Sequence, residues 1–114
     1  MKRLWQAFLN TLDGLKWAAR HETAVLQELA ALAIAVPLSF LVTSSPWTRV
    51  ALVGSVMLVL VVEFLNTAIE KLCDHLAPEL NAKIKVVKDL GSAAVFITIV
   101  LAAAVWLIVL AHGL

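Results

Sequence analysis

The sequence is poor in charge, in glycine and in cysteine, and each shortage excludes a class of protein. Charged residues make up 15% of the 114 positions, and nine basic against eight acidic residues leave a formal net charge of +1. Nucleic-acid binders usually carry a broad basic excess, so this balance argues against that class. The single cysteine, Cys73, excludes an internal disulfide and disfavours a zinc site, since only His75 stands near it. The four glycines form neither of the two familiar glycine-rich phosphate-binding loops.

Apolar residues dominate the sequence instead. They make up 62% of the chain, against roughly 45 to 50% in soluble domains, so we expect a membrane protein. Residues 29–47 and 90–111 carry no charge, and each run is long enough to cross a hydrocarbon core of roughly 30 Å as a helix. A further helix pattern begins near Trp47, after the turn at Pro46, and continues to about Leu76, where Ala77-Pro78 should end it. The prediction is one all-α domain, residues 1–114, with spans at about 26–43, 47–72 and 90–111.

Residues 3–20 predict an amphipathic helix on the membrane surface. Apolar residues from Trp5 and Phe8 to Leu15 recur at helical spacing, and charged residues occupy the other positions. An ordinary helix packed on the loops is the alternative. A signal peptide is disfavoured because Asp13 and Lys16 interrupt the apolar pattern.

The distribution of basic residues predicts the orientation. Four precede the first span, four lie in the region that joins the second span to the third, and only Arg49 follows the turn between the first and second spans. By the positive-inside rule, the N-terminus and the second loop are cytoplasmic and the C-terminus lies outside.

Small residues recur at four-residue spacing in all three spans, as in Ala31 and Ala35 or Ala51 and Ser55. This spacing indicates close helix contacts. Three helices form a thin bundle with little interior, so a polar site inside it needs walls from other copies of the chain. We therefore expect a homo-oligomer.

Polar residues follow the charge-free run 50–62 on the second span. At 100° per residue, Glu63, Asn66, Glu70 and Asp74 share an arc of about 80°. Carboxylates inside a membrane are costly and suggest function. Counting from the start of the span places Glu63 about 6 Å inside the cytoplasmic boundary and Glu70 just beyond it. The alternatives without a catalytic role are that Glu63 only fixes the helix register and that Asp74 is a solvated residue at the helix end.

Glu63 and Glu70 need different roles, because they lie about 10 Å apart along the helix axis. Glu70, near water and flanked by Asn66, suits Mg²⁺ shared with nucleotide phosphates. A carboxylate shielded from water accepts a proton more readily, so Glu63 suits a general base that acts on a hydroxyl at headgroup level. At the same interface, Glu22 would complete the metal site and Lys88 would neutralise phosphate charge, unless Lys88 and the adjacent Asp89 are mere boundary charges.

Two segments, EFLNTAIEKLCD at 63–74 and KDLGSAAV at 88–95, resemble the small bacterial integral-membrane diacylglycerol kinases, a family that also includes undecaprenol kinases. The resemblance extends across nearly the whole chain. It implies a homotrimer of three-span subunits with an N-terminal surface helix in the bacterial inner membrane. It also implies that MgATP phosphorylates a lipid hydroxyl at a site shared between subunits, with no protein partner besides the chain's own copies.

The resemblance also assigns roles to individual residues. Glu63 matches the catalytic base, Glu22 and Glu70 match the metal-binding carboxylates, and Asn66 matches the asparagine beside the base. The stretch HETAVLQE, with Glu28 after Gln27, favours the diacylglycerol kinase branch. The loop APELNAKIKVV departs from the family pattern, which leaves the adenine contacts open. The remaining matches are nucleotide-binding positions at Glu22, Glu70, Lys88, Asp89, Arg3, Asn10, Glu79 and Asn81, and substrate-supporting positions at Glu28, Arg49 and Trp106.

Two other functions remain open from the sequence. An undecaprenol kinase would use the same chemical residues and differ only in its lipid groove. A small proton-coupled transporter would also place a glutamate such as Glu63 inside the membrane, but it leaves Asn66, Glu70 and Lys88 at one interface unexplained.

Overall fold

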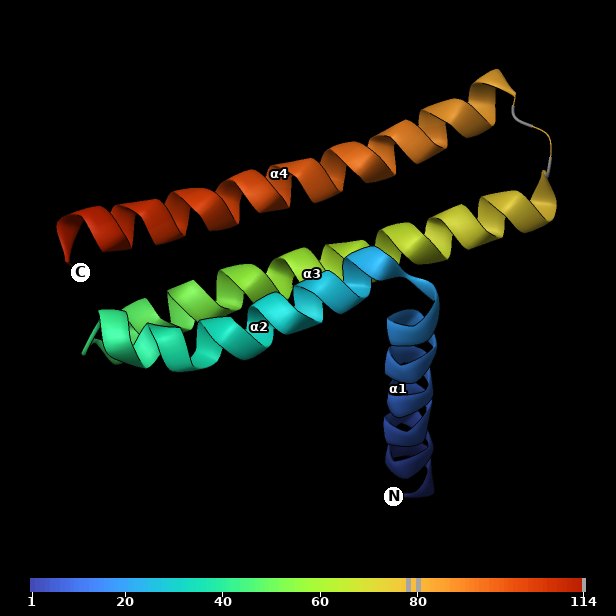
Figure 1. Ribbon diagram of the computed structural model, residues 1–114. Coiled ribbons are helices and arrows are strands. Elements are labelled where there is room, and N and C mark those ends of the chain that lie inside the picture. Colours follow the sequence, from blue (N-terminus) through green and yellow to red (C-terminus); the bar gives the residue numbers. More distant parts are fainter. Residues whose placement is uncertain (78, 80, 114) are drawn as a thin grey trace.

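A computed structural model describes residues 1–77, 79 and 81–113 (Figure 1). These residues form four α-helices and no strand: α1 (Lys2–His21), α2 (Thr23–Val42), α3 (Pro46–Leu76) and α4 (Ala82–His112). Of these, α2, α3 and α4 are long and apolar enough to cross a membrane, which confirms the predicted all-α class with three candidate spans. The trimer and the surface position of the first helix stay predictions.

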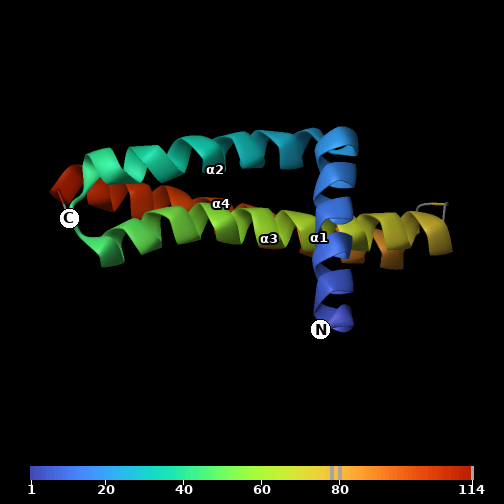
Figure 2. The ribbon, with the colours of Figure 1, turned by 90° about the horizontal axis from the view of Figure 1, so that it is seen from below.

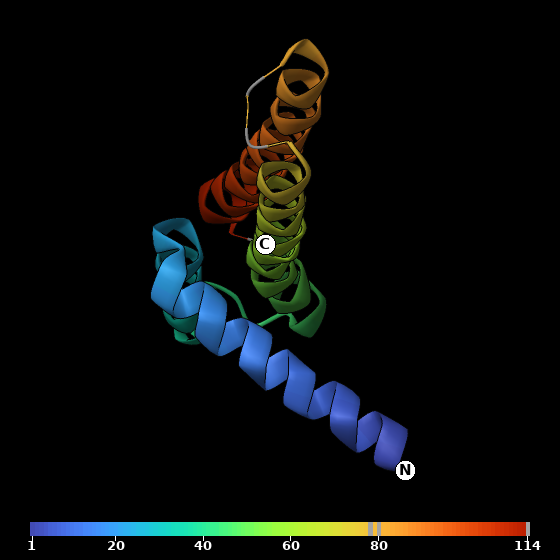
Figure 3. The same cartoon turned by 90° about the vertical axis from the view of Figure 1, so that its right-hand side faces the viewer.

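The central helix of the molecule is α3. It packs against α2 and against α4, and these two interfaces hold most of the contacts between helices. Figure 3 shows the three spans grouped together when viewed along them, and Figures 1 and 2 show α1 turning away to run across their common direction. Polar groups on α3 can therefore meet α2 on one side and α4 on the other.

The ends of α3 and α4 follow from local chemistry. The Ser45 Oγ accepts a hydrogen bond from the Thr48 N–H at 3.3 Å, and Pro46 opens α3, where its missing N–H is not needed. The helix ends at Leu76, as the sequence predicted, although Pro78 itself lies outside the described residues. The Asn81 Oδ1 accepts from the Ile84 N–H at 3.0 Å and so caps the start of α4.

A single residue, Glu22, forms the corner between α1 and α2. Its extended backbone, with φ −123° and ψ 110°, breaks the helix for one position. Ala18 before the corner and Val25 after it are buried against Leu60 of α3, and Phe64 packs on the same cluster. Because Leu60 and Phe64 flank Glu63 in the sequence, this packing holds the corner beside the polar part of α3.

Apolar side chains cover much of the outer surface of the three spans. Leu41, Trp47 and Leu107 are among the many large hydrophobic residues that stay exposed. In a bilayer such side chains meet acyl chains or neighbouring copies, so their exposure does not carry the cost that it has in water.

Candidate active site

Glu63 has three acidic neighbours. Its charge is repelled by those of Glu22, at the corner, and of Glu70, two turns further along α3. Glu28 of α2 and Glu63 also repel one another. All four side chains are half-buried. We refer to Glu22, Glu28, Glu63 and Glu70 as the acidic cluster.

Asn66 is buried between α3 and α4, and it positions one member of the cluster. Its Nδ2 donates a hydrogen bond to Glu70 Oε1 at 3.1 Å, and its exposed fraction is 8%. The Asn66 Oδ1 is buried without a hydrogen-bond partner among the described residues. Gly91 of α4 lies directly against this amide, so that a Cβ at residue 91 would overlap with Asn66 Oδ1. The amide fits there because Gly91 has no side chain.

Lys88 joins the start of α4 to the end of α3. Its Nζ donates to Asp74 Oδ1 at 2.7 Å, and its charge also interacts with that of Glu70. Asp74 is therefore more than a solvated helix end, although its side chain is 59% exposed. The adjacent Asp89 pairs with Lys85 at 2.6 Å on an exposed part of α4.

Glu22 has a partner that the sequence did not reveal. Lys71 Nζ lies 3.4 Å from Glu22 Oε1 and 5.6 Å from the centroid of the Trp17 ring. Trp17 in turn stacks on His21, with ring centroids 4.5 Å apart. No sequence pattern links residues 22 and 71, because only the packing of the corner on α3 brings them together.

The acidic cluster fits Mg²⁺ by the chemistry of its donors. No three acidic, histidine or cysteine side chains among residues 1–77, 79 and 81–113 come together as a complete metal site. However, Mg²⁺ usually takes one or two protein carboxylates and completes its shell with water and substrate phosphates. Glu22 and Glu70, which both lie close enough to Glu63 to repel its charge, supply two such oxygen donors.

An apolar pocket of about 300 Å³ opens beside the cluster, between α2, α3 and α4. Its polar group is the carboxylate of Glu28, whose Oε1 is buried without a hydrogen-bond partner in the described chain. Trp106 of α4 forms part of the wall, and its Nε1 donates to the Leu52 carbonyl at 3.1 Å. Trp106 is thus a packed ring of the bundle. The pocket can take an acyl chain and presents a carboxylate at its wall.

Several residues that the resemblance assigned to the site lie away from the cluster within one chain. Arg49 is fourteen residues before Glu63, which is roughly 21 Å along a helix. Arg3 and Asn10 lie on α1, where the Asn10 Oδ1 accepts from Gln6 at 3.1 Å. Glu79 is exposed between α3 and α4, and Asn81 caps α4. Their assignments stay predictions.

Comparison with known proteins gives one consistent result. The sequence model of a family described as "Prokaryotic diacylglycerol kinase" matches residues 9–110. The chain is 42% identical to the diacylglycerol kinase of Escherichia coli strain K12 over 108 residues, which cover 95% of this chain and 88% of that protein. It is 35% identical to the Haemophilus influenzae diacylglycerol kinase, over 84% of this chain and 81% of the relative. For the Pseudomonas aeruginosa diacylglycerol kinase the identity is 33%, over 96% and 89%.

Proposed function

Because the chain belongs to the prokaryotic diacylglycerol kinase family, we propose that it transfers the γ-phosphate of ATP to the primary hydroxyl of diacylglycerol and so forms phosphatidic acid. A kinase of this family is a multi-pass membrane protein that acts on a lipid and uses ATP as co-substrate. The acidic cluster supports the proposal, since Glu28 both interacts with Glu63 and lines an apolar pocket between the candidate spans.

In this mechanism Glu63 is the general base. It accepts the proton of the lipid hydroxyl while the hydroxyl oxygen attacks the γ-phosphorus in line with the leaving ADP, so that no covalent enzyme intermediate forms. Glu22, Glu28 and Glu70 place repelling negative charge near Glu63. The positive charge of Mg²⁺ bound with ATP would offset this repulsion.

Glu22 and Glu70 would hold Mg²⁺, which supplies positive charge next to the transferred phosphate. Asn66 keeps the Glu70 carboxylate in place through its Nδ2 hydrogen bond. Lys88 would exchange Asp74 for a phosphate oxygen and so offset the negative charge that develops during transfer. Asp89 follows it at the start of α4 and would contact the nucleotide.

Glu28 and Trp106 would position the lipid, because both line the apolar pocket beside the acidic cluster. Arg49 lies too far along α3 to reach the reacting groups, so any contact that it makes with a lipid is separate from the chemistry.

A homotrimer with sites shared between subunits would bring further nucleotide contacts from a neighbouring chain. Arg3 and Asn10 of α1, with Glu79 and Asn81 before α4, would then reach a neighbouring subunit's nucleotide. In this arrangement α1 lies on the cytoplasmic surface of the bacterial inner membrane, where the exposed Trp5 and Phe8 meet the lipid boundary. The N-terminus would be cytoplasmic and the C-terminus outside.

A single assay tests the proposed reaction. Purified protein in mixed micelles receives ATP labelled at the γ-phosphate together with diacylglycerol, undecaprenol or no lipid. We expect label in phosphatidic acid, and at most slow labelling of undecaprenol. Faster labelling of undecaprenol than of diacylglycerol would identify the chain as an undecaprenol kinase instead. Membership of a kinase family leaves the transporter hypothesis without support, and lipid-independent proton flux without phosphate transfer would be needed to revive it.

A further inference from the structure

Arg49 carries a positive charge near the end of α3 opposite the acidic cluster, and no acidic side chain of the described residues forms an ion pair with it. Its Nη2 donates to the Thr43 carbonyl at 3.0 Å, and its Cζ lies 4.0 Å from the centroid of the Phe40 ring. Among the described residues no carboxylate lies within ion-pair distance of it, and its Nε has no hydrogen-bond partner. A buried N–H group without a hydrogen-bond acceptor costs free energy, and more so when the group is charged. An anion from outside the described chain would lower that cost.

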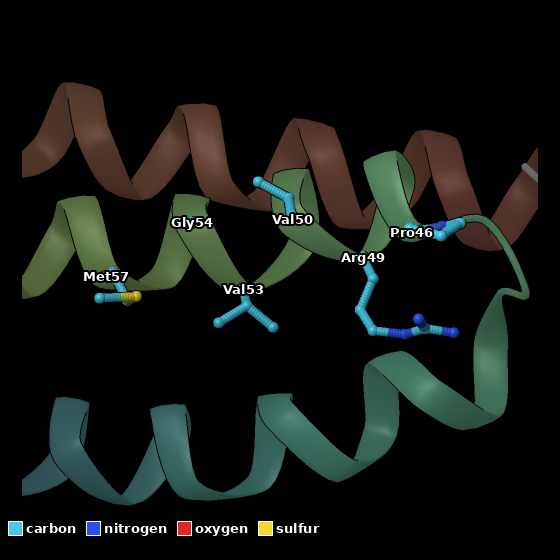
Figure 4. Close-up of a pocket in the computed structure, with 6 residues that line it drawn as sticks. All are labelled: Pro46, Arg49, Val50, Val53, Gly54 and Met57. Carbon is cyan, nitrogen blue, oxygen red and sulfur yellow. The ribbon is translucent and has the colours of Figure 1, made fainter.

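Arg49 also lies between two pockets of different character. One, of about 400 Å³, follows α3 from Pro46 to Met57 and is otherwise lined by apolar side chains and Gly54. Figure 4 shows Arg49 and Val53 directed to the same side of α3 at this pocket. The other, of about 450 Å³, lies at the end of the bundle and includes Thr43 and Ser44. A polar space and an apolar space thus meet at one guanidinium.

We propose that Arg49 and these pockets bind an anionic phospholipid of the membrane leaflet opposite the acidic cluster. The phosphate oxygens accept hydrogen bonds from the outer N–H groups of the guanidinium, a geometry that arginine favours. One acyl chain lies along Val53, Gly54 and Met57 in the apolar pocket. This lining favours a lipid over free phosphate, because a soluble ion would leave the apolar pocket unfilled. The site is separate from the pocket beside Glu28 and does not depend on the proposed reaction.

Native mass spectrometry of the detergent-purified protein tests the proposal. The probes are phosphatidylglycerol and phosphatidylcholine with identical dioleoyl chains. We expect phosphatidylglycerol to bind roughly tenfold more tightly, as one charge-assisted contact would give. Arg49→Gln should remove this preference, and Arg49→Lys should retain part of it because the charge remains. Arg20→Gln, which removes an exposed charge from α1, is the matched control and should keep the preference.

Gly54→Leu tests the acyl part of the site without touching Arg49. A Cβ at residue 54 meets no atom within 4 Å, so the added side chain fills the pocket rather than displacing the core. It should weaken binding of both lipids severalfold, while Gly14→Leu, an equally open helical glycine on α1, should not. Unchanged preference in Arg49→Gln, wild-type lipid affinity in Gly54→Leu, or displacement of phosphatidylglycerol by millimolar inorganic phosphate would each overturn the proposal. If Arg49→Gln does not fold, the Gly54→Leu result decides.

Discussion

Gly91 of α4 lies against Asn66 of α3: the asparagine amide occupies the space where any other residue at position 91 would place its Cβ. The same amide holds Glu70 through its Nδ2 hydrogen bond. The helix contact and the orientation of a proposed metal ligand therefore depend on the same pair of residues.

Gly91→Ala should lower both stability and activity. In an exposed helix this change stabilises by roughly 1 kcal/mol, but here the methyl group would push the Asn66 amide away, and overpacking typically costs about 1–3 kcal/mol. The displaced amide would release Glu70, so kcat should fall along with the thermal midpoint. Unfolding in detergent and the phosphate-transfer assay measure the two effects.

Gly54→Ala provides the matched control, because nothing lies within 4 Å of its added Cβ. It should be neutral or slightly stabilising, with unchanged kcat. The double change Gly91→Ala with Asn66→Ala should recover stability relative to Gly91→Ala, because the clash is gone, but not activity. Normal kcat in Gly91→Ala would show that the Asn66 position does not matter for Glu70.

Glu70→Gln should shift the dependence on Mg²⁺ before it affects anything else. The amide removes the negative charge that a hard cation prefers, while its carbonyl can still accept the Asn66 hydrogen bond. We expect the half-saturating Mg²⁺ concentration to rise by roughly tenfold or more, which corresponds to about 1.4 kcal/mol. A metal titration of initial rates at saturating ATP measures it, and an unmoved curve would remove Glu70 from the metal site.

Lys88→Ala should raise the KM for ATP by roughly tenfold or more, since a charge-assisted contact to a phosphate contributes about 1.5–3 kcal/mol. Lys83→Ala, at an exposed position on the same helix, is the control and should leave KM unchanged. Lys88→Ala also removes the ion pair between Lys88 and Asp74. The variant Asp74→Asn removes this ion pair but keeps Lys88, and so separates loss of the ion pair from loss of the phosphate contact. Asp74→Asn should leave KM unchanged or lower it. If it raised KM as much as Lys88→Ala, the ion pair rather than the phosphate contact would be the function of Lys88.

The sequence predicted the helices well because their signals are local. Charge-free runs marked the spans, the turn at Pro46 marked the start of α3, and Ala77-Pro78 marked its end at Leu76. The family resemblance drawn from the segments at 63–74 and 88–95 is confirmed by the match over residues 9–110. Helical periodicity also placed Asn66 and Glu70 on one face, and the hydrogen bond between them agrees with it.

Contacts between helices could not be predicted in the same way. The pairing of Lys71 with Glu22 and that of Lys88 with Asp74 depend on how the corner and α4 pack against α3, which periodicity along one helix does not contain. The small residues at 91–94 suggested a close approach, but not that the Asn66 side chain would fill the space at Gly91. Contacts that need a second subunit, such as those expected of Arg3 and Asn10, depend on how the subunits pack against one another.

The role of Glu63 as general base is tested most directly by phosphate transfer from labelled ATP to diacylglycerol in the Glu63→Gln variant, with nucleotide binding and oligomeric state measured on the same preparation. Glutamine keeps the size of the side chain but cannot accept the hydroxyl proton, so turnover should fall by about 10²–10⁴-fold while nucleotide binding and assembly stay normal. Near-normal turnover in this variant would contradict the account.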